Sequence, residues 1–180
     1  MITSCSGNNL TQAQKDQIWE ILCECDKEFY PWLSARESSS QKQLIVDESA
    51  ASQKLPVTYF NEMIRQEFLL AQKDGRLVGF MTFKTDYLCD ALESFGRSLY
   101  VTTVCVRHNN RREGVMKALY DFLEQEIPAL YHCNRLSTRT WSLNEAQLHE
   151  LFKRGYTDLA VLKNDRGNGV DTIYFGKVCQ

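Results

Sequence analysis

Residues 107–117, RHNNRREGVMK, gather cationic side chains around a single glycine just before an amphipathic stretch. The four cations stand against one acid, Glu113, so the segment has a local charge of +3 in a chain whose formal net charge is −2. The cations are Arg107, Arg111, Arg112 and Lys117. The first turn of a helix has unpaired N–H groups and a partial positive charge, both of which favour an anion. Because Gly114 has no side chain to block the backbone, the segment predicts a phosphate-binding loop.

Two other interpretations of this loop stay open. Asn110 with Glu113 three residues later is typical of an ordinary capped helix start whose arginines are simply solvated. The loop also suits another nucleotide or polyanion. It lacks the Gly-Lys-Ser/Thr of a Walker loop and the GxGxxG of a dinucleotide fold.

Length and composition set the class of protein. With 180 residues, 43% of them hydrophobic, the chain predicts one globular domain with its own core. It has seven cysteines, an odd number without a CxxC pair, which favours reduced thiols and a cytoplasmic protein. The polar N-terminus is unlike a signal peptide, and no apolar run is long enough to span a bilayer.

The first third of the sequence predicts mainly helix. Thr11 and Gln14 resemble a capping box at the start of a helix over 9–29, which Pro31 ends. The Ser-rich and charged stretch 34–54 predicts a loop, and a second short helix is expected after Pro56. Residues 1–8 are either a short first strand or frayed.

The remainder alternates strands and helices. Asp-Gly in KDG joins two apolar runs into a hairpin, and the β-branched run 98–107 predicts a central strand covered on both faces. The expected strands are 67–72, 76–84, 98–107, 135–143, 158–163 and 170–177, with helices over 115–127 and 144–156 and a loose link over 86–97. The fold class is therefore a single α+β domain over 1–180, with a twisted, mixed, mostly antiparallel sheet of about six to seven strands flanked by helices on both faces.

The order of these motifs resembles the GNAT-type N-acetyltransferases. Val104-x-Val106-x₄-Arg111-x-x-Gly114, between a central strand and a helix, is similar to the acetyl-CoA motif of that family. Asn144 opens NEAQLHELFKRGY, which is similar to the second motif and ends in Gly155-Tyr156. The hairpin LLAQKDGRLVGFMTF resembles the early strands, so the resemblance covers roughly residues 67–176.

This resemblance implies an acetyl-CoA-dependent N-acetyltransferase that passes acetyl directly to an amine of a small molecule or a protein. Residues 67–178 would form the sheet with the acetyl-CoA site, and 1–66 a helical region on the acceptor side. The implied acetyl-CoA-binding residues are Val104, Cys105, Val106, Arg111, Arg112, Glu113, Gly114, Val115, Met116, Lys117 and Asn144. Asn144 is alternatively a plain helix cap. No metal is expected.

The sequence departs from the family pattern at two positions. Met116 stands where the loop usually ends in a small residue, and Leu151 stands where the family often has a tyrosine that protonates the departing thiolate. A thiol with a pKa near 8.5 leaves tolerably well with the help of water. Leu151 nevertheless keeps open a second hypothesis, a non-catalytic acyl-CoA-binding or protein-interaction module with the same fold.

For the general base the sequence offers only candidates. Glu93, and beside it Asp90, precede the central strand near the expected acceptor, although surface carboxylates are usually just solvated. Tyr100, Thr102 and Thr103 lie on that strand. No Cys–His or Ser–His pair is recognisable in the motifs, which favours direct transfer over a covalent intermediate.

The acceptor pocket would be built by the N-terminal third of the chain. Its aromatic residues, Tyr30, Trp32, Tyr59 and Phe60, are either core or substrate contacts and are not interleaved with cations. We therefore expect neither a nucleic-acid nor a membrane partner. Monomer and homodimer both stay open.

Overall fold

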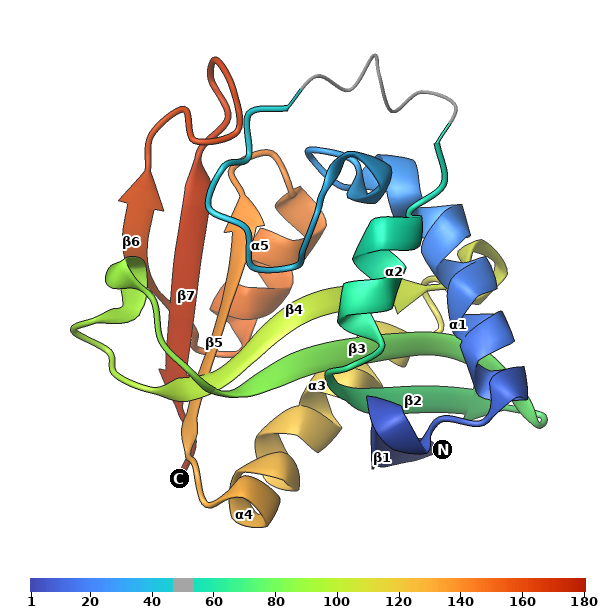
Figure 1. The fold of residues 1–180 in the computed structure, drawn as a ribbon. Helices are drawn as coiled ribbons and strands as arrows, with labels where there is room; N and C mark the ends of the chain where they lie inside the picture. Colours follow the sequence, from blue (N-terminus) through green and yellow to red (C-terminus); the bar gives the residue numbers. More distant parts are fainter. Residues whose placement is uncertain (47–53) are drawn as a thin grey trace.

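The computed structural model describes residues 1–46 and 54–180, which are built around a seven-stranded sheet (Figure 1). The strands are β1 (Ile2–Ser6), β2 (Glu67–Lys73), β3 (Arg76–Tyr87), β4 (Ser98–Val106), β5 (Arg135–Trp141), β6 (Thr157–Leu162) and β7 (Thr172–Val178). Their order in the sheet is β1-β2-β3-β4-β5-β7-β6; β4 and β5 run parallel and the other neighbours antiparallel. The predicted mixed, mostly antiparallel sheet is confirmed, with residues 2–6 as an edge strand.

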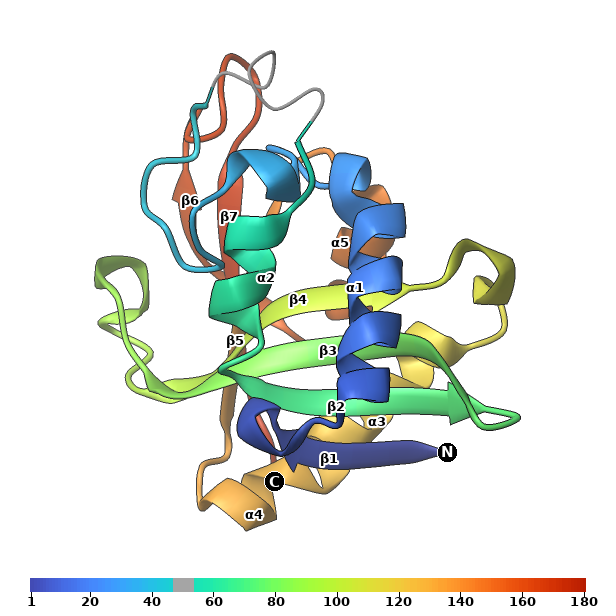
Figure 2. The same cartoon turned by 45° about the vertical axis from the view of Figure 1, so that its right-hand side comes forward.

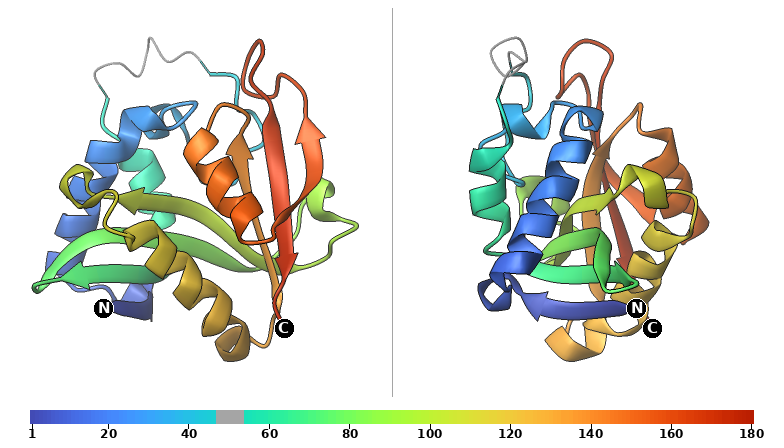
Figure 3. Two further views of the ribbon diagram at one scale, coloured as in Figure 1. Left: turned by 180° about the vertical axis from the view of Figure 1, so that it is seen from behind. Right: turned by 90° about the vertical axis from the view of Figure 1, so that its right-hand side faces the viewer.

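Helices cover both faces of this sheet, as predicted (Figures 2 and 3). They are α1 (Gln12–Cys25), α2 (Val57–Met63), α3 (Val115–Gln125), α4 (Ile127–Tyr131) and α5 (Glu145–Lys153). α1 and α2 lie on one face, and α3, α4 and α5 lie on the other. Burial of apolar surface on each face supplies the main driving force for this arrangement.

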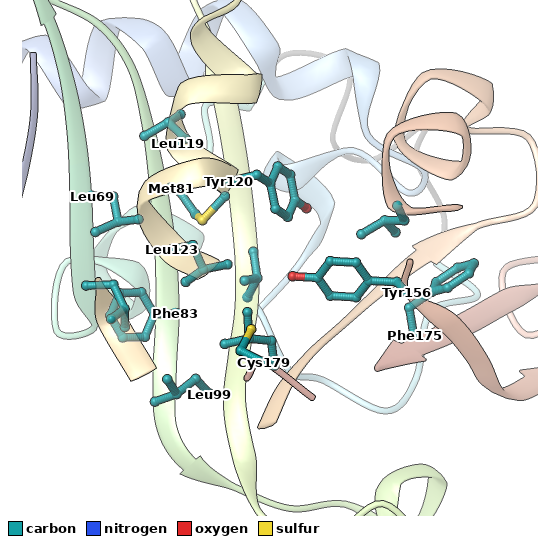
Figure 4. Packing of buried hydrophobic residues seen from close by; sticks show 14 of the residues in the cluster. Leu69, Met81, Phe83, Leu99, Leu119, Tyr120, Leu123, Tyr156, Phe175 and Cys179 are labelled. Atoms are coloured by element: carbon teal, nitrogen blue, oxygen red, sulfur yellow. The ribbon is translucent and has the colours of Figure 1, made fainter. Parts of the chain in front are cut away.

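Each face has its own hydrophobic core. On the α1 side, Ile18, Ile21 and Leu22 pack in one buried cluster with Phe68 and Phe80 of the sheet. On the opposite side, Leu119, Tyr120 and Leu123 of α3 pack with Leu69, Met81 and Phe83 (Figure 4). The 3–4 residue spacing on each helix and the alternation along each strand produce these two layers.

Two helix predictions need correction. The helix expected over 9–29 begins only after Thr11, because Thr11 and Gln14 form the predicted capping box, and it ends at Cys25 in a short 3₁₀ turn, Asp26–Glu28. The helix expected over 115–127 ends at Gln125, and Pro128 belongs to the first turn of the separate α4. Proline lacks an N–H, so it suits a first turn and not a helix interior.

The two expected irregular segments are also refined. Of the loop expected over 34–54, residues 34–35 belong to a 3₁₀ turn, Leu33–Ala35, residues 36–46 and 54 contain no helix or strand, and 47–53 lie outside the described residues. The link expected over 86–97 is shorter, because β3 continues to Tyr87 and a 3₁₀ turn forms at Asp90–Leu92.

A bulge in β4 shapes the centre of the sheet. Thr82 pairs with Thr103 while Phe83 pairs with Val101, so Thr102 is an extra residue on β4. The alternation of β4 is consequently reversed, with Val101 in the α3-side core and Cys105 in the α1-side core. Pairing of β4 with β5 ends at Val101–Thr138, and the two strands diverge beyond that point (Figure 1).

Candidate functional site

A cleft of about 600 Å³ opens where β4 and β5 diverge. It is walled by the second half of β4, the 107–117 loop, the end of β5 and the start of α5. The residues of the predicted acetyl-CoA set that line it are Val104, Cys105, Val106, Arg111, Arg112, Gly114, Val115, Met116, Lys117 and Asn144. Glu113 is the exception, because its carboxylate accepts from Lys73 Nζ (3.0 Å) and Asn110 Nδ2 (3.1 Å) and does not line the cleft.

The first turn of α3 is open to this cleft. Gly114 is the N-cap residue, with a φ of 80° in the left-handed region, and no described side chain caps the helix. Asn110 lies further upstream, so the alternative of a helix capped by Asn110 is wrong. A Cβ on Gly79 of β3 would lie 2.8 Å from Cys105 O and 3.0 Å from Val115 Cγ1, so this glycine lets α3 begin close to the sheet. Exposed first-turn N–H groups are the donors that a phosphate needs.

Acids of α1 and of the 3₁₀ turn that follows it neutralise much of the charge of this loop. Arg107 donates to Glu20 (2.7 Å) and Glu24 (2.8 Å), and Arg111 donates to Glu28 (2.6 Å). These contacts tie α1 to the loop that follows β4. The Glu20-x₃-Glu24-x₃-Glu28 spacing, one helical face of acids, is the sequence signal that would have revealed this pairing.

The other two cations behave differently. Lys117 forms an ion pair with Asp121 one turn along α3, at 2.6 Å. Arg112 is exposed, has a φ of 63°, and makes no side-chain hydrogen bond or ion pair with the described part of the chain. Arg112 is therefore the cation of the loop that is most available to an incoming anion.

Cys25, which the sequence analysis did not single out, also lines the cleft. Its thiol donates to Val106 O (3.8 Å) and accepts from Arg111 Nη2 (3.7 Å). The hydrogen bond with Cys105 and the charge of Arg111 lower the pKa of Cys25 against the effect of burial, whereas burial raises the pKa of Cys105. Cys105 is thus the buried, inert thiol that its place in mid-strand suggests.

Asn144 joins α5 to the cleft. Its Oδ1 accepts from the N–H of Gln147 (3.3 Å) and its Nδ2 donates to Thr140 Oγ1 (3.0 Å), so it caps α5 while lining the cleft. A contact between Asn144 and bound pantetheine remains a prediction. Leu151 is fully buried in the α3-side core, and no tyrosine is among the described residues that line the cleft.

The candidate carboxylate bases, Glu93 and Asp90, do not line the cleft. Glu93 follows the turn Asp90–Leu92, is exposed, and does not line the cleft. Asp90 pairs with Lys42 at 3.1 Å, with both side chains exposed. Tyr100, a further candidate on the central strand β4, is fully buried. Glu93 as the base therefore stays a prediction, and any proton path to it leads out of the cleft.

Thr102 and Thr103 do line the cleft. Thr102 Oγ1 lies 2.5 Å from Gln66 Oε1, to which it donates, and the Gln66 amide in turn donates to Glu62 (3.1 Å). Thr103 Oγ1 lies 2.7 Å from the hydroxyl of Tyr59, whose pKa burial raises to about 12. The chain from Thr102 to Glu62 has no sequence signature, because its members come from α2, the turn after it and the bulge of β4.

Two of the four aromatic residues expected at the acceptor pocket, Tyr59 and Phe60, pack in the protein interior, whereas Tyr30 is exposed. Tyr59 is fully buried, and Phe60 stacks edge-on against Trp19 at 5.2 Å. The aromatic rings that line the cleft are instead Phe29 and Trp141, whose centroids lie 5.9 Å apart. Neither was singled out, because their contact joins the end of α1 to the end of β5.

Three further features bear on the class of protein. No helix in residues 1–46 and 54–180 is long and apolar enough to cross a membrane. The same residues contain no group of three or more side chains arranged to hold a metal ion. All seven cysteines are free thiols.

Fold and cleft together define an acyl-CoA N-acyltransferase-like protein, and comparisons identify the family. The sequence profile of the acetyltransferase (GNAT) family matches residues 17–156, so the chain belongs to that family. It is accordingly an enzyme of the acetyl-CoA-dependent N-acetyltransferase class, with acetyl-CoA as co-substrate. Among curated proteins no significant match is found.

Solved structures support the same fold at low sequence identity. A ribosomal-protein-alanine N-acetyltransferase from Brucella melitensis has a TM-score of 0.63 and 16% identity, covering 99% of each chain. An N-acetyltransferase from Staphylococcus aureus Mu50 has a TM-score of 0.66 and 16% identity, covering 100% of this chain and 98% of its own. An aminoglycoside 6'-N-acetyltransferase complexed with coenzyme A has a TM-score of 0.65 and 18% identity, covering 99% of this chain and 96% of its own. At these identities the similarity shows the fold alone.

Proposed function

We propose that this acetyltransferase passes acetyl directly from acetyl-CoA to an amine of a small molecule or of a protein. The observation that carries the proposal is the divergence of β4 from β5 after Val101 and Thr138, which creates a cleft between the predicted pyrophosphate loop and the N-terminal region. An amine that enters from the side of residues 1–66 would meet a thioester held against β4. Orientation of two reactants in one cleft supplies several kcal/mol of the barrier.

The loop would hold the pyrophosphate of the co-substrate, and β4 would hold its pantetheine. The pyrophosphate would lie over the first turn of α3, where Gly114 leaves the N–H groups accessible and Arg112 is available as a cation. The pantetheine would then run along residues 104–106, whose edge towards β5 has no strand partner among the described residues. Asn144 on the opposite wall is within the same cleft and offers an amide.

Direct transfer is favoured by the surroundings of the thiol in the cleft. The ring of His108 lies against Glu28, with Nε2 at 2.8 Å from Oε1, and not against Cys25. The Cys25 thiol donates instead to Val106 O. Because no basic side chain of the described residues accepts a hydrogen bond from this thiol, we infer that the amine attacks the thioester carbonyl, a tetrahedral adduct forms, and the CoA thiolate leaves.

Proton transfer has two candidate routes, Glu93 or a water near β4. We propose the water route, because Thr102 and Thr103 line the cleft at the bulge whereas Glu93 does not. Because Thr102 Oγ1 donates its hydrogen to Gln66, it accepts from Thr82 Oγ1 at 2.7 Å, and its second lone pair remains for a water or an amine. With Leu151 buried in the core, water also protonates the departing thiolate.

The decisive experiment combines binding and turnover. Calorimetric titration with acetyl-CoA and CoA tests the loop, and a screen of amines and amino-terminal peptides with detection of free CoA tests transfer. Glu93→Gln should leave the pH profile of turnover unchanged if water carries the proton; a displaced profile would restore Glu93 as base. Tight CoA binding without release of CoA to any amine would favour the non-catalytic module. The seven free thiols support the cytoplasm as the compartment.

A further inference from the structure

Arginines from three segments surround the acceptor side of the cleft. Arg36 follows α1, Arg139 lies on β5, and Arg166 lies between β6 and β7. Arg36 and Arg166 are only 6% and 4% exposed, and Arg139 itself lines the cleft. A buried guanidinium is costly unless an acid or a set of acceptors compensates it.

Two of these arginines back the aromatic wall of the cleft. The guanidinium of Arg36 lies over the ring of Phe29 at 5.6 Å, and that of Arg166 lies over the ring of Trp141 at 5.5 Å. Phe29 and Trp141 are the rings that line the cleft. Arg139 stands two residues before Trp141 on the same strand, so Arg139 and Arg166 lie at the same end of the cleft.

Neutral groups bind the guanidinium groups of Arg139 and Arg166. Arg139 donates to the Tyr174 hydroxyl (3.2 Å) and to the carbonyls of Ser39 (3.3 Å) and Gln41 (2.8 Å). Its Nε–H donates to none of the described residues. These contacts satisfy part of the N–H donors of the Arg139 guanidinium, but no acid balances its positive charge within the described residues.

Arg166 is in the same situation. It donates to Thr172 Oγ1 (2.9 Å) and to the carbonyl of Tyr30. The adjacent Asp165 accepts from the Thr172 hydroxyl at 2.6 Å, and neither Arg139 nor Arg166 forms an ion pair within the described residues. Burial, with the charges of Arg36 and Arg139, lowers the pKa of Arg166. A guanidinium stays protonated in a protein, so the lowered pKa of Arg166 indicates that its charged form is destabilised here. A bound anion would stabilise that charged form.

We propose that the acceptor amine carries a carboxylate, which binds at Arg139 in the cleft with Arg166 supplying positive potential from behind Trp141. The inference rests on the proposed function and names its substrate class. The same field disfavours acceptors with additional positive charges, such as polyamines. The reaction itself is unchanged: the amine nitrogen gains the acetyl group and loses a proton, and the CoA thiolate leaves.

Matched acceptors test the inference on the unmodified protein. The pairs are glycine with glycinamide, β-alanine with β-alaninamide, and phenylalanine with phenylalaninamide, assayed by release of free CoA. The acid is expected to have a kcat/KM about tenfold above its amide, the effect of one charge-assisted contact. The amine of each amide loses its proton more readily, so without an anion site the amide would react faster. Equal or better rates for the amides would overturn the inference.

A variant locates the anion site. Arg139→Gln should bring the acid-to-amide ratio of kcat/KM close to one while the KM for acetyl-CoA stays unchanged. The matched control is Arg135→Gln on the same strand, an exposed residue outside the cleft, which should keep the ratio. If Arg139→Gln does not fold, as judged by thermal denaturation, Arg166→Gln should lower the ratio as well. An unchanged ratio in the folded variant would overturn the inference.

Binding separates this inference from the proposed function. Calorimetry of CoA-saturated protein with β-alanine and β-alaninamide requires no turnover. Acid-selective binding without acetylation of any amine would contradict the proposed function and support the inference. Turnover with no preference between acids and amides would support the proposed function and contradict the inference. Absence of both acid-selective binding and acid preference would reject the inference.

Discussion

The guanidinium of Arg111 donates to the carboxylate of Glu28 across 2.6 Å, which fastens the predicted pyrophosphate loop to the 3₁₀ turn after α1. His108 Nε2 lies 2.8 Å from the other oxygen of the same carboxylate. A diphosphate that enters the cleft therefore meets an arginine already engaged by an acid. Burial would raise the pKa of Glu28, but the contacts with Arg111 and His108 outweigh it and lower that pKa.

Removal of this acid should strengthen binding of acetyl-CoA. In Glu28→Gln the negative charge next to the phosphate position is gone and Arg111 is released, so we expect the Kd for CoA to fall about two- to tenfold. Calorimetry at low and at high salt measures it, and the gain should shrink as salt rises. The matched control is Glu24→Gln, which loosens Arg107 and does not line the cleft. A weaker affinity in Glu28→Gln would mean that Glu28 positions Arg111 for the phosphate.

Gly114 should be more sensitive to substitution than Arg112. With a φ of 80°, Gly114→Val strains the backbone at the N-cap of α3 and places a side chain over the first-turn N–H groups. We expect loss of measurable CoA binding with about 1–2 kcal/mol of destabilisation. Arg112→Ala removes one exposed cation and should weaken binding only about tenfold, with no loss of thermal stability. A larger effect of Arg112→Ala would show that charge outweighs backbone access.

The sequence was sufficient to predict the layers of this fold because the signals were local. Alternation in β2 and β3, the Asp-Gly turn and the Thr11–Gln14 box each act within a few residues. Contacts that depend on the assembled sheet were not predictable in this way. The bulge at Thr102 arises from the register between β3 and β4, and the local sequence of β4 does not predict it.

In the candidate site, too, the residues of a local motif were predicted and those brought together by tertiary packing were not. The loop around Gly114 was predicted from a compact motif, and most of it lines the cleft. Cys25, Phe29 and Trp141 were missed, because they reach the cleft only once the end of α1 packs against β4 and β5. The pairing of Arg107 and Arg111 with α1 was missed for the same reason, since the cations looked free when read within their own segment.

Glu62 should make part of the stability depend on pH. Burial would raise the pKa of Glu62, but the contact with Lys84 Nζ at 2.8 Å and the N–H of Ser39 lower it. A carboxylate whose pKa is lowered in the folded state contributes stability above its unfolded pKa, near 4.3, and loses it as the pH falls through the folded value. Glu62→Gln should therefore cost about 1–2 kcal/mol at neutral pH and much less in acid.

Urea unfolding at a neutral and an acidic pH measures this difference. Glu93→Gln is the matched control, because the Glu93 side chain is exposed and makes no hydrogen bond within the described residues, so the stability curve of this variant should follow the unmodified protein at both pH values. An identical loss of stability in Glu62→Gln at both pH values would exclude titration of Glu62 as the cause.

Asn144 allows the capping role and the binding role of one side chain to be separated. Its Oδ1 caps α5 and its Nδ2 faces Thr140, so Asn144→Ala should lose about 1 kcal/mol of stability and also weaken acetyl-CoA binding. Asn144→Ser keeps a capping oxygen but is too short to offer an amide to the pantetheine. We expect the serine variant to regain the stability of the protein but not its affinity, as measured by thermal denaturation and by calorimetry. Recovery of both by serine would show that Asn144 contributes to binding only by holding α5 in place.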